Sequence, residues 1–194
     1  MSDKPKKTVT NVVRLENVRL AFPELFVAKQ VNGEGTARYS AALIMDPNHS
    51  GLAALERVFK VVAKEKWGDE AEETLTLLKK KDKLALHDGD DKPNYEGYPG
   101  NHFVNANSTS RPTVVDKDRS ALIEGDGVIY SGCYVNAIIE IWAQDNKYGK
   151  RINATLKGVQ FYAKGDAFSG SPPAQADDFD DLSVAEDGGD DLAA

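Results

Sequence analysis

The sequence predicts a mainly β protein: a small antiparallel barrel, interrupted once by helices and followed by a tail without a packed core. Three observations lead to this class. Five or six segments have the composition of strands, the helical patterns fall in one block between residues 45 and 84, and residues after 164 are mostly Gly, Ser, Pro, Ala and Asp. Because strands and helices do not alternate, the sequence disfavours a doubly wound parallel sheet.

The two longest predicted strands lie within residues 128–163 and are joined by a polar turn at residues 145–150, which is the pattern of a hairpin. At a period of two, the first strand has two different faces. The aliphatic face carries Ile129, Cys133, Val135, Ala137, Ile139 and Ile141; the other carries Tyr130, Tyr134, Asn136 and Trp142, with Ile138 and Glu140 between them. The aliphatic face requires a core. The row of rings is either a second packing layer or a platform for flat ligands.

Strands are expected at residues 11–20 and 38–45, helices at 51–66 and 70–81, and a loop at 87–100. A short strand at 102–107 and an extended segment at 111–116 follow. Ser50 is the expected N-cap of the first helix, and Phe22-Pro23 is expected to end the first strand. A small antiparallel barrel with one helical insertion favours the OB-fold, a common oligonucleotide-binding module. We expect a disordered basic arm (1–10), an OB-fold domain (11–165) and a disordered acidic tail (166–194).

The charge is distributed unevenly along the chain. The whole sequence has 24 Lys and Arg against 31 Asp and Glu, a formal charge of −7. Eight of the acids and none of the bases follow residue 170, so residues 1–170 hold 24 bases against 23 acids. A single cysteine excludes a disulfide within the chain and a Cys-based zinc site. Without an apolar run of about 20 residues or a signal segment, we expect no membrane contact and a cytoplasmic location.

Aromatic side chains interleaved with cations are typical of proteins that bind single-stranded nucleic acid, because bases stack on rings while phosphates contact cations. The candidate DNA-binding residues are Arg38, Tyr39, Tyr95, Tyr98, Phe103, Arg111, Tyr130, Tyr134, Trp142, Lys147, Tyr148, Lys150 and Arg151. Each has an alternative interpretation. The rings of Tyr130, Tyr134 and Trp142 could form a second core layer, the hairpin cations could only solubilise a turn, and Arg38 or Arg111 could pair with a carboxylate.

Signals of catalysis are weak. The three histidines are scattered, and neither a phosphate-binding glycine loop nor a nucleophile elbow is present. Asp88, Asp90, Asp91 and Glu96 are reminiscent of a metal loop, but Lys92 stands where an EF-hand needs an oxygen ligand. We therefore expect that the protein is not an enzyme and that it binds neither a cofactor nor a metal.

Four blocks in order carry a resemblance to a known family: LENVRLAFPELF, RYSAALIMDP, YEGYPGNHFVNANSTSRPTVVD and YSGCYVNAIIEIWAQDNKYGKRINATLKGVQ. Together they resemble a family of bacteriophage single-stranded DNA-binding proteins formerly filed as a domain of unknown function. The resemblance implies an OB-fold, binding of single-stranded DNA without marked sequence preference, no catalysis, and a tail that recruits replication or recombination proteins. Acidic tails of such proteins often end in an aromatic residue, whereas this chain ends in Asp191-Leu192-Ala193-Ala194.

Within residues 171–194, Phe179 is the only aromatic residue and could serve in place of a terminal ring. The expected partner-binding segment is therefore Asp177, Asp178, Phe179, Asp180, Asp181 and Leu182. We expect a protein that coats and protects single-stranded DNA during phage replication, recombination or repair, in the cytoplasm of an infected bacterial host cell. The alternative is a protein-interaction adaptor whose acidic tail docks replication proteins. The sequence leaves assembly into a homo-oligomer open.

Overall fold

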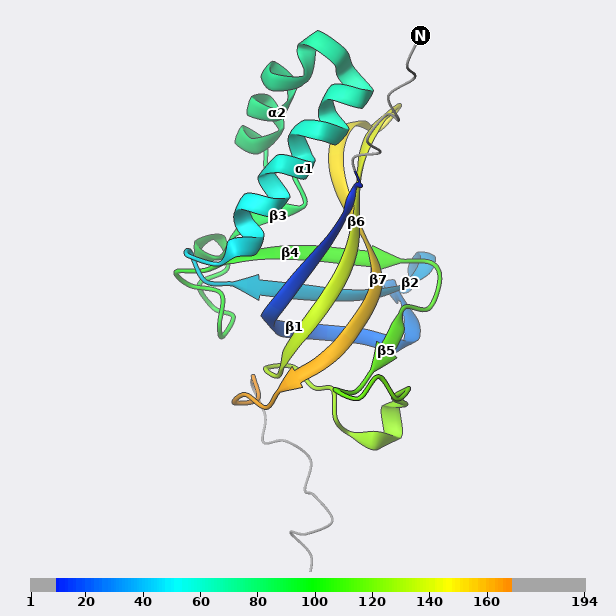
Figure 1. The fold of residues 1–194 in the computed structure, drawn as a ribbon. Helices are drawn as coiled ribbons and strands as arrows, with labels where there is room; N and C mark the ends of the chain where they lie inside the picture. Colours follow the sequence, from blue (N-terminus) through cyan, green and yellow to red (C-terminus); the bar gives the residue numbers. More distant parts are fainter. Residues whose placement is uncertain (1–9, 169–194) are drawn as a thin grey trace, which may run out of the picture.

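The computed structural model describes residues 10–168, and its centre is a closed barrel of five strands (Figure 1). The barrel strands are β1 (Val12–Val31), β2 (Glu34–Met45), β4 (His102–Ser108), β6 (Tyr134–Asn146) and β7 (Gly149–Ala163). They pair in the order β4-β2-β1-β6-β7, and a parallel contact between β4 and β7 closes the barrel. This is the topology of an OB barrel, so the predicted fold class is confirmed.

Two short strands extend the sheet beyond the barrel. β3 (Leu86–Asp88) pairs with β4, and β5 (Thr113–Val115) pairs in parallel with β7. The prediction for the hairpin was right in its two strands but wrong in its bounds. β6 begins at Tyr134 rather than near residue 128, and only Lys147 and Tyr148 separate it from β7.

The inner face of β6 forms the centre of the core, as its aliphatic pattern predicts. Cys133, just before the strand, and Val135, Ala137, Ile139 and Ile141 are fully buried. Burial also raises the pKa of the Cys133 thiol, because an apolar environment disfavours the thiolate. Ile129 belongs to the preceding loop and is only partly buried.

The first strand is longer than the sequence predicts, because Pro23 does not end it. The pairing of β1 with β2 shifts register between Ala21 and Glu24, and Phe22 adopts a positive φ of 47°. Such a bulge leaves the proline's missing N–H outside the regular ladder. β1 then continues to a two-residue turn at Asn32-Gly33, where both φ angles are positive, as a tight hairpin requires.

The helical insertion follows β2 and lies at one end of the barrel (Figure 1). Helix α1 (Ser50–Trp67) buries Leu55, Phe59 and Val62 in the main core, and a 3-10 turn at residues 68–70 leads into α2 (Ala71–Lys80). The N-cap is His49, not Ser50. Its Nε2 lies 2.7 Å from the Glu16 carbonyl oxygen, which leaves Nδ1 to accept a 2.9 Å hydrogen bond from the Gly51 N–H.

The chain stays packed beyond the expected domain end at residue 165. The Phe168 N–H donates to the Ser131 carbonyl oxygen at 3.0 Å, and the Arg19 guanidinium lies 4.3 Å from the centre of the Phe168 ring. Residues 166–168 therefore pack against the loop before β6 and against β1. No helix within residues 10–168 is long and apolar enough to cross a membrane.

Candidate nucleic-acid interface

A groove of about 310 Å³ opens on the outer face of the barrel where β4, β6 and β7 meet. It is lined by Arg38, Asn107, Ser108, Thr109, Trp142, Gln144, Asn153, Ala154 and Thr155. Strand register brings these residues together. Asn107 is paired with Thr155 across the closure of the barrel, and Trp142 is paired with Asn153 across the hairpin. We call these nine residues the Trp142 groove.

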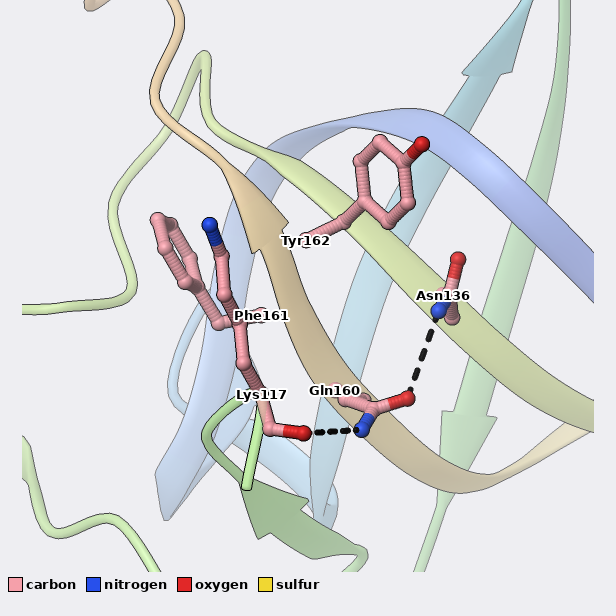
Figure 2. Close-up of a pocket in the computed structure, with 5 residues that line it drawn as sticks. All are labelled: Lys117, Asn136, Gln160, Phe161 and Tyr162. Atoms are coloured by element: carbon pink, nitrogen blue, oxygen red, sulfur yellow. Dashed lines mark hydrogen bonds between the residues drawn. The ribbon is translucent and has the colours of Figure 1, made fainter. Parts of the chain in front are cut away.

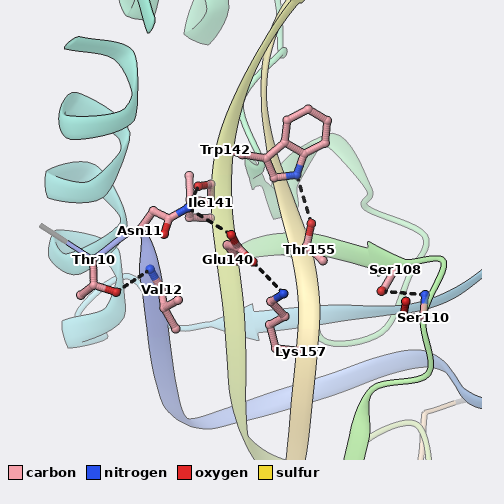
Figure 3. Close-up of polar contacts among 10 residues, drawn as sticks. All are labelled: Thr10, Asn11, Val12, Ser108, Ser110, Glu140, Ile141, Trp142, Thr155 and Lys157. Atoms are coloured by element: carbon pink, nitrogen blue, oxygen red, sulfur yellow. Dashed lines mark hydrogen bonds and ion pairs between the residues drawn. The ribbon is translucent and has the colours of Figure 1, made fainter. Parts of the chain in front are cut away.

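The Trp142 ring is the main aromatic surface of this groove. Its side chain is 42% exposed, and its indole N–H donates to Thr155 Oγ1 at 3.1 Å (Figure 3). The hydrogen bond holds the indole in one orientation without burying it. Of the two interpretations that the sequence left open for Trp142, the structure therefore supports the exposed ring rather than the second core layer.

A cation with a fixed position stands in the same groove. One guanidinium nitrogen of Arg38 donates to Asn107 Oδ1 at 3.1 Å. No carboxylate within residues 10–168 pairs with Arg38, so its charge is available to a phosphate. Exposed Arg151 lies opposite Gln144 in the hairpin and likewise has no ion-pair partner in the described part of the chain. Tyr39 is half-buried and lies on the opposite side of β2 from Arg38. That is the side on which Ala41 enters the main core.

The two predicted lysines at the hairpin turn, Lys147 and Lys150, have different surroundings. Tyr148 is 80% exposed, with the Lys147 ammonium 5.0 Å from its ring centre. Lys150, by contrast, lies 3.7 Å from Glu70 Oε2 and 5.5 Å above the Trp67 ring. Lys150 stays a predicted DNA contact, but the 3-10 turn after α1 places Glu70 beside it, so its charge is less available to DNA than that of Lys147. The indole N–H of Trp67 also fixes the turn by donating to Asp145 Oδ2 at 2.8 Å.

Two of the predicted rings are core residues. Tyr98 and Phe103 are each 2% exposed and form a second small cluster with Ala21, Ala42 and Ile44. The cluster exists because the loop after β3 folds over the outer face of β2 and β4. Burial raises the pKa of the Tyr98 phenol to about 12. The prediction that these two rings stack bases is therefore wrong, because neither presents a face to solvent.

Tyr95 stands at the edge of that second cluster and remains 48% exposed. Its ring contacts Phe22 edge-on at 5.4 Å between centres, with the Lys92 ammonium 5.5 Å from the Tyr95 ring. The outer faces of β2 and β4 connect this edge to the Trp142 groove, since Arg38 and Asn107 lie on the same faces as Ala42 and Phe103. Tyr95 therefore keeps a place on the candidate interface that Tyr98 loses.

Three further predicted residues lie outside the groove. Tyr130 packs on the main core, and its hydroxyl donates to the Gly165 carbonyl and accepts from the Gly165 N–H, at 2.8 and 3.1 Å. Tyr134 lies at the opposite end of β6 from the turn, 5.5 Å from the Arg19 guanidinium. Arg111 is exposed on the loop after β4, 5.9 Å above the Phe26 ring. The structure gives Tyr130 a structural role.

The sequence analysis missed the polar lining of the groove: Asn107, Ser108, Thr109, Gln144, Asn153 and Thr155. A signal was present, because Gln144 shares the parity of Trp142 on β6. The residues of β7 and β4 could be found only with the strand register, which the sequence does not contain. Within residues 10–168 no three His, Cys, Asp or Glu side chains are grouped to hold a metal. The predicted partner-binding segment at 177–182 lies outside the described residues.

Comparison with known proteins gives one family and several similar chains. A family model described as "Enterobacter phage Enc34, ssDNA-binding protein" matches residues 10–191. A protein named "Putative protein p50", from Acyrthosiphon pisum secondary endosymbiont phage 1, is 43% identical over 178 residues, which are 90% of this chain and 96% of that protein.

Solved structures agree with that match. The single-stranded DNA-binding protein of bacteriophage Enc34 in complex with ssDNA is 25% identical, with a TM-score of 0.68 over 81% of this chain and 89% of that one. The gp2.5 single-stranded DNA-binding protein of bacteriophage T7 is 12% identical, with a TM-score of 0.51 over 78% of this chain and 91% of that one. At that identity the second likeness concerns the fold alone.

Proposed function

Because the chain belongs to the family of the single-stranded DNA-binding protein of Enterobacter phage Enc34, a family of binding proteins and not of enzymes, we propose that it coats and protects single-stranded DNA without sequence preference. The observation that carries this proposal is the Trp142 groove. A half-exposed indole, a guanidinium without an acidic partner among residues 10–168, and a lining of amides and hydroxyls share one open face.

Each part of the groove has a role in this proposal. The indole of Trp142 stacks one base, and stacking tolerates any sequence because every base has a π-face. Arg38 and Arg151 contact the phosphates on either side. Tyr148 with Lys147 at the turn, and Tyr95 with Lys92 across β2 and β4, provide further ring-and-cation pairs. Tyr39, Tyr134 and Arg111 remain candidates for outer contacts.

The overall negative charge is compatible with DNA binding because the acids are concentrated at the end of the chain. Residues 1–170 are nearly neutral, so unpaired cations around the groove produce a local positive potential. The acidic segment 171–194 competes with phosphate for those cations. We further propose that Phe179 and its neighbouring aspartates recruit replication or recombination proteins, in the cytoplasm of an infected bacterial cell.

A titration of labelled oligonucleotides tests the proposal. Fluorescence anisotropy is followed with single-stranded and duplex DNA of one length, in several sequences and at two salt concentrations. We expect tighter binding to the single strands, little dependence on sequence, and a log–log salt slope of about −0.7 for each phosphate contact. Equal affinity for duplex and single strand would contradict stacking. No binding to either would favour the adaptor, whose aromatic face holds protein instead.

A further inference from the structure

A second recess lies at the other end of the β6–β7 hairpin. It has a volume of about 520 Å³ and is lined by Lys117, Asn136, Gln160, Phe161 and Tyr162 (Figure 2). We propose that it is a second nucleotide-binding subsite, in which a base stacks on Tyr162 and its phosphate contacts Lys117. This inference rests on the proposed function and extends it, because the same DNA strand would occupy both the Trp142 groove and this recess.

The ring that would stack the base is available. Tyr162 is 46% exposed, close to the value for Trp142, and its ring stands away from β7 above Asn136 (Figure 2). No hydrogen bond within residues 10–168 involves its hydroxyl. The ring faces outward because the pairing of β7 with β6 shifts register between Ile138 and Ile139. The shift puts Val159 and Phe161 in the core and turns Gln160 and Tyr162 outward.

Two amide side chains beside the ring are held in place. Asn136 Oδ1 accepts from the Asn17 N–H at 3.0 Å, and Asn136 Nδ2 donates to Gln160 Oε1 at 3.3 Å. Gln160 Nε2 donates in turn to the Lys117 carbonyl oxygen at 3.3 Å. Each amide keeps some unused capacity, a second hydrogen on Asn136 Nδ2 and a second lone pair on Gln160 Oε1. Together they offer a donor and an acceptor to the edge of a stacked base.

A cation completes the recess. The Lys117 ammonium lies 5.6 Å from the centre of the Phe161 ring and forms no ion pair with any carboxylate in the described part of the chain. A ring, a donor–acceptor pair and a free ammonium are the contacts that proteins use for a nucleotide of a single strand. The parts come from β6, from β7 and from the loop after β5.

The surface between the two sites allows a strand to pass. Glu140 would repel phosphate, but Lys157 lies 2.7 Å from its Oε2, and this hydrogen bond also holds the pKa of Glu140 below its usual value (Figure 3). Ile138, next along the same face, is 42% exposed. From Trp142 to Tyr134, beside Tyr162, β6 spans eight residues, or about 26 Å. That is about eight nucleotides at a stacked spacing of about 3.4 Å, within the range of OB-fold site sizes.

The length of the oligonucleotide separates this inference from the function on which it rests. We expect Tyr162→Ala to weaken binding of a single strand of about 16 nucleotides by about 5- to 150-fold, the effect of one lost stack. Binding of a strand of about four nucleotides, which fills only the Trp142 groove, should be unchanged. Tyr162→Phe should bind like the native protein and Tyr162→Leu like the alanine variant, because stacking needs the ring and not the hydroxyl.

A matched control comes from α2, at the other end of the molecule. Leu77 is 48% exposed, so Leu77→Ala removes a side chain of similar exposure and should leave both affinities unchanged. Lys117→Gln should make the salt slope for the long strand shallower by about 0.7 and leave that for the short strand as it is. If Tyr162→Ala binds the long strand as tightly as the native protein does, the second subsite is wrong. If instead the native protein bound duplex DNA as tightly as single strands at both lengths, the proposed function itself would be contradicted.

Discussion

Replacement of Trp142 by alanine tests the groove at its centre. If the indole stacks one base, Trp142→Ala should lose about 1–3 kcal/mol of binding free energy, or about 5- to 150-fold in Kd. The variant also loses packing. The side chain is 42% exposed, so about three-fifths of the 150–250 Å² of a tryptophan is buried, and at about 25 cal/mol per Å² its removal costs at most about 2–4 kcal/mol of folding stability.

Loss of stability and loss of stacking therefore have to be separated. Leu78 on α2 is 4% exposed, and Leu78→Ala should cost about 2–5 kcal/mol of stability at a position outside the groove. We expect Leu78→Ala to melt at least as early as Trp142→Ala and yet to bind oligo-dT like the native protein. Affinity is measured by anisotropy well below both melting temperatures. If both variants lose affinity equally, destabilisation and not a lost stack explains the effect, and the argument for the groove fails.

Three other perturbations have expected outcomes. Removal of residues 171–194 should tighten single-strand binding at low salt and much less at high salt, because tethered carboxylates compete with phosphate and screening suppresses that competition; equal low-salt affinities would exclude it. Arg38→Ala should make the salt slope shallower by about 0.7, whereas Lys150→Ala should change it little because Glu70 already pairs that ammonium, and the reverse ranking in salt titrations would refute this assignment. Burial raises the pKa of Tyr98 from 10.0 in the unfolded chain to about 12, so its contribution to stability is complete below about pH 10 and is lost as the pH rises towards 12; unfolding curves of Tyr98→Phe should show a weaker loss over that interval, and an unchanged loss would assign it to other groups.

The spacing of apolar residues predicted those parts of the fold that depend on neighbouring residues along the chain. The alternation along β6 identified both its buried aliphatic face and the exposed side that carries Trp142, because a strand with one face in a core has a fixed register. The helical block was found from its periodicity. The bulge at Phe22 was not found, because a proline after a strand-like run is as consistent with an end as with a bulge.

The surroundings of several predicted site residues depend on contacts between distant parts of the chain. Tyr98 and Phe103 become core only because the loop after β3 folds over two strands, and Lys150 is paired only because α1 ends beside the hairpin turn. Tyr162 was overlooked because the bulge near Lys157 reverses the parity of β7. A break was visible in the sequence, where alternating Ile152, Ala154 and Leu156 are followed by Val159 and Phe161.

Tryptophan fluorescence during a titration with oligo-dT tests the central claim most directly, namely that a base stacks on Trp142. The chain has two tryptophans, and Trp67 is only 9% exposed, so a stacked base should quench Trp142 alone. We predict strong quenching in the native protein, saturating with the binding seen by anisotropy. The quenching should be absent from Trp142→Phe, which keeps a ring and so still binds. Saturable binding without quenching, or equal quenching in Trp142→Phe, would show that the DNA lies elsewhere.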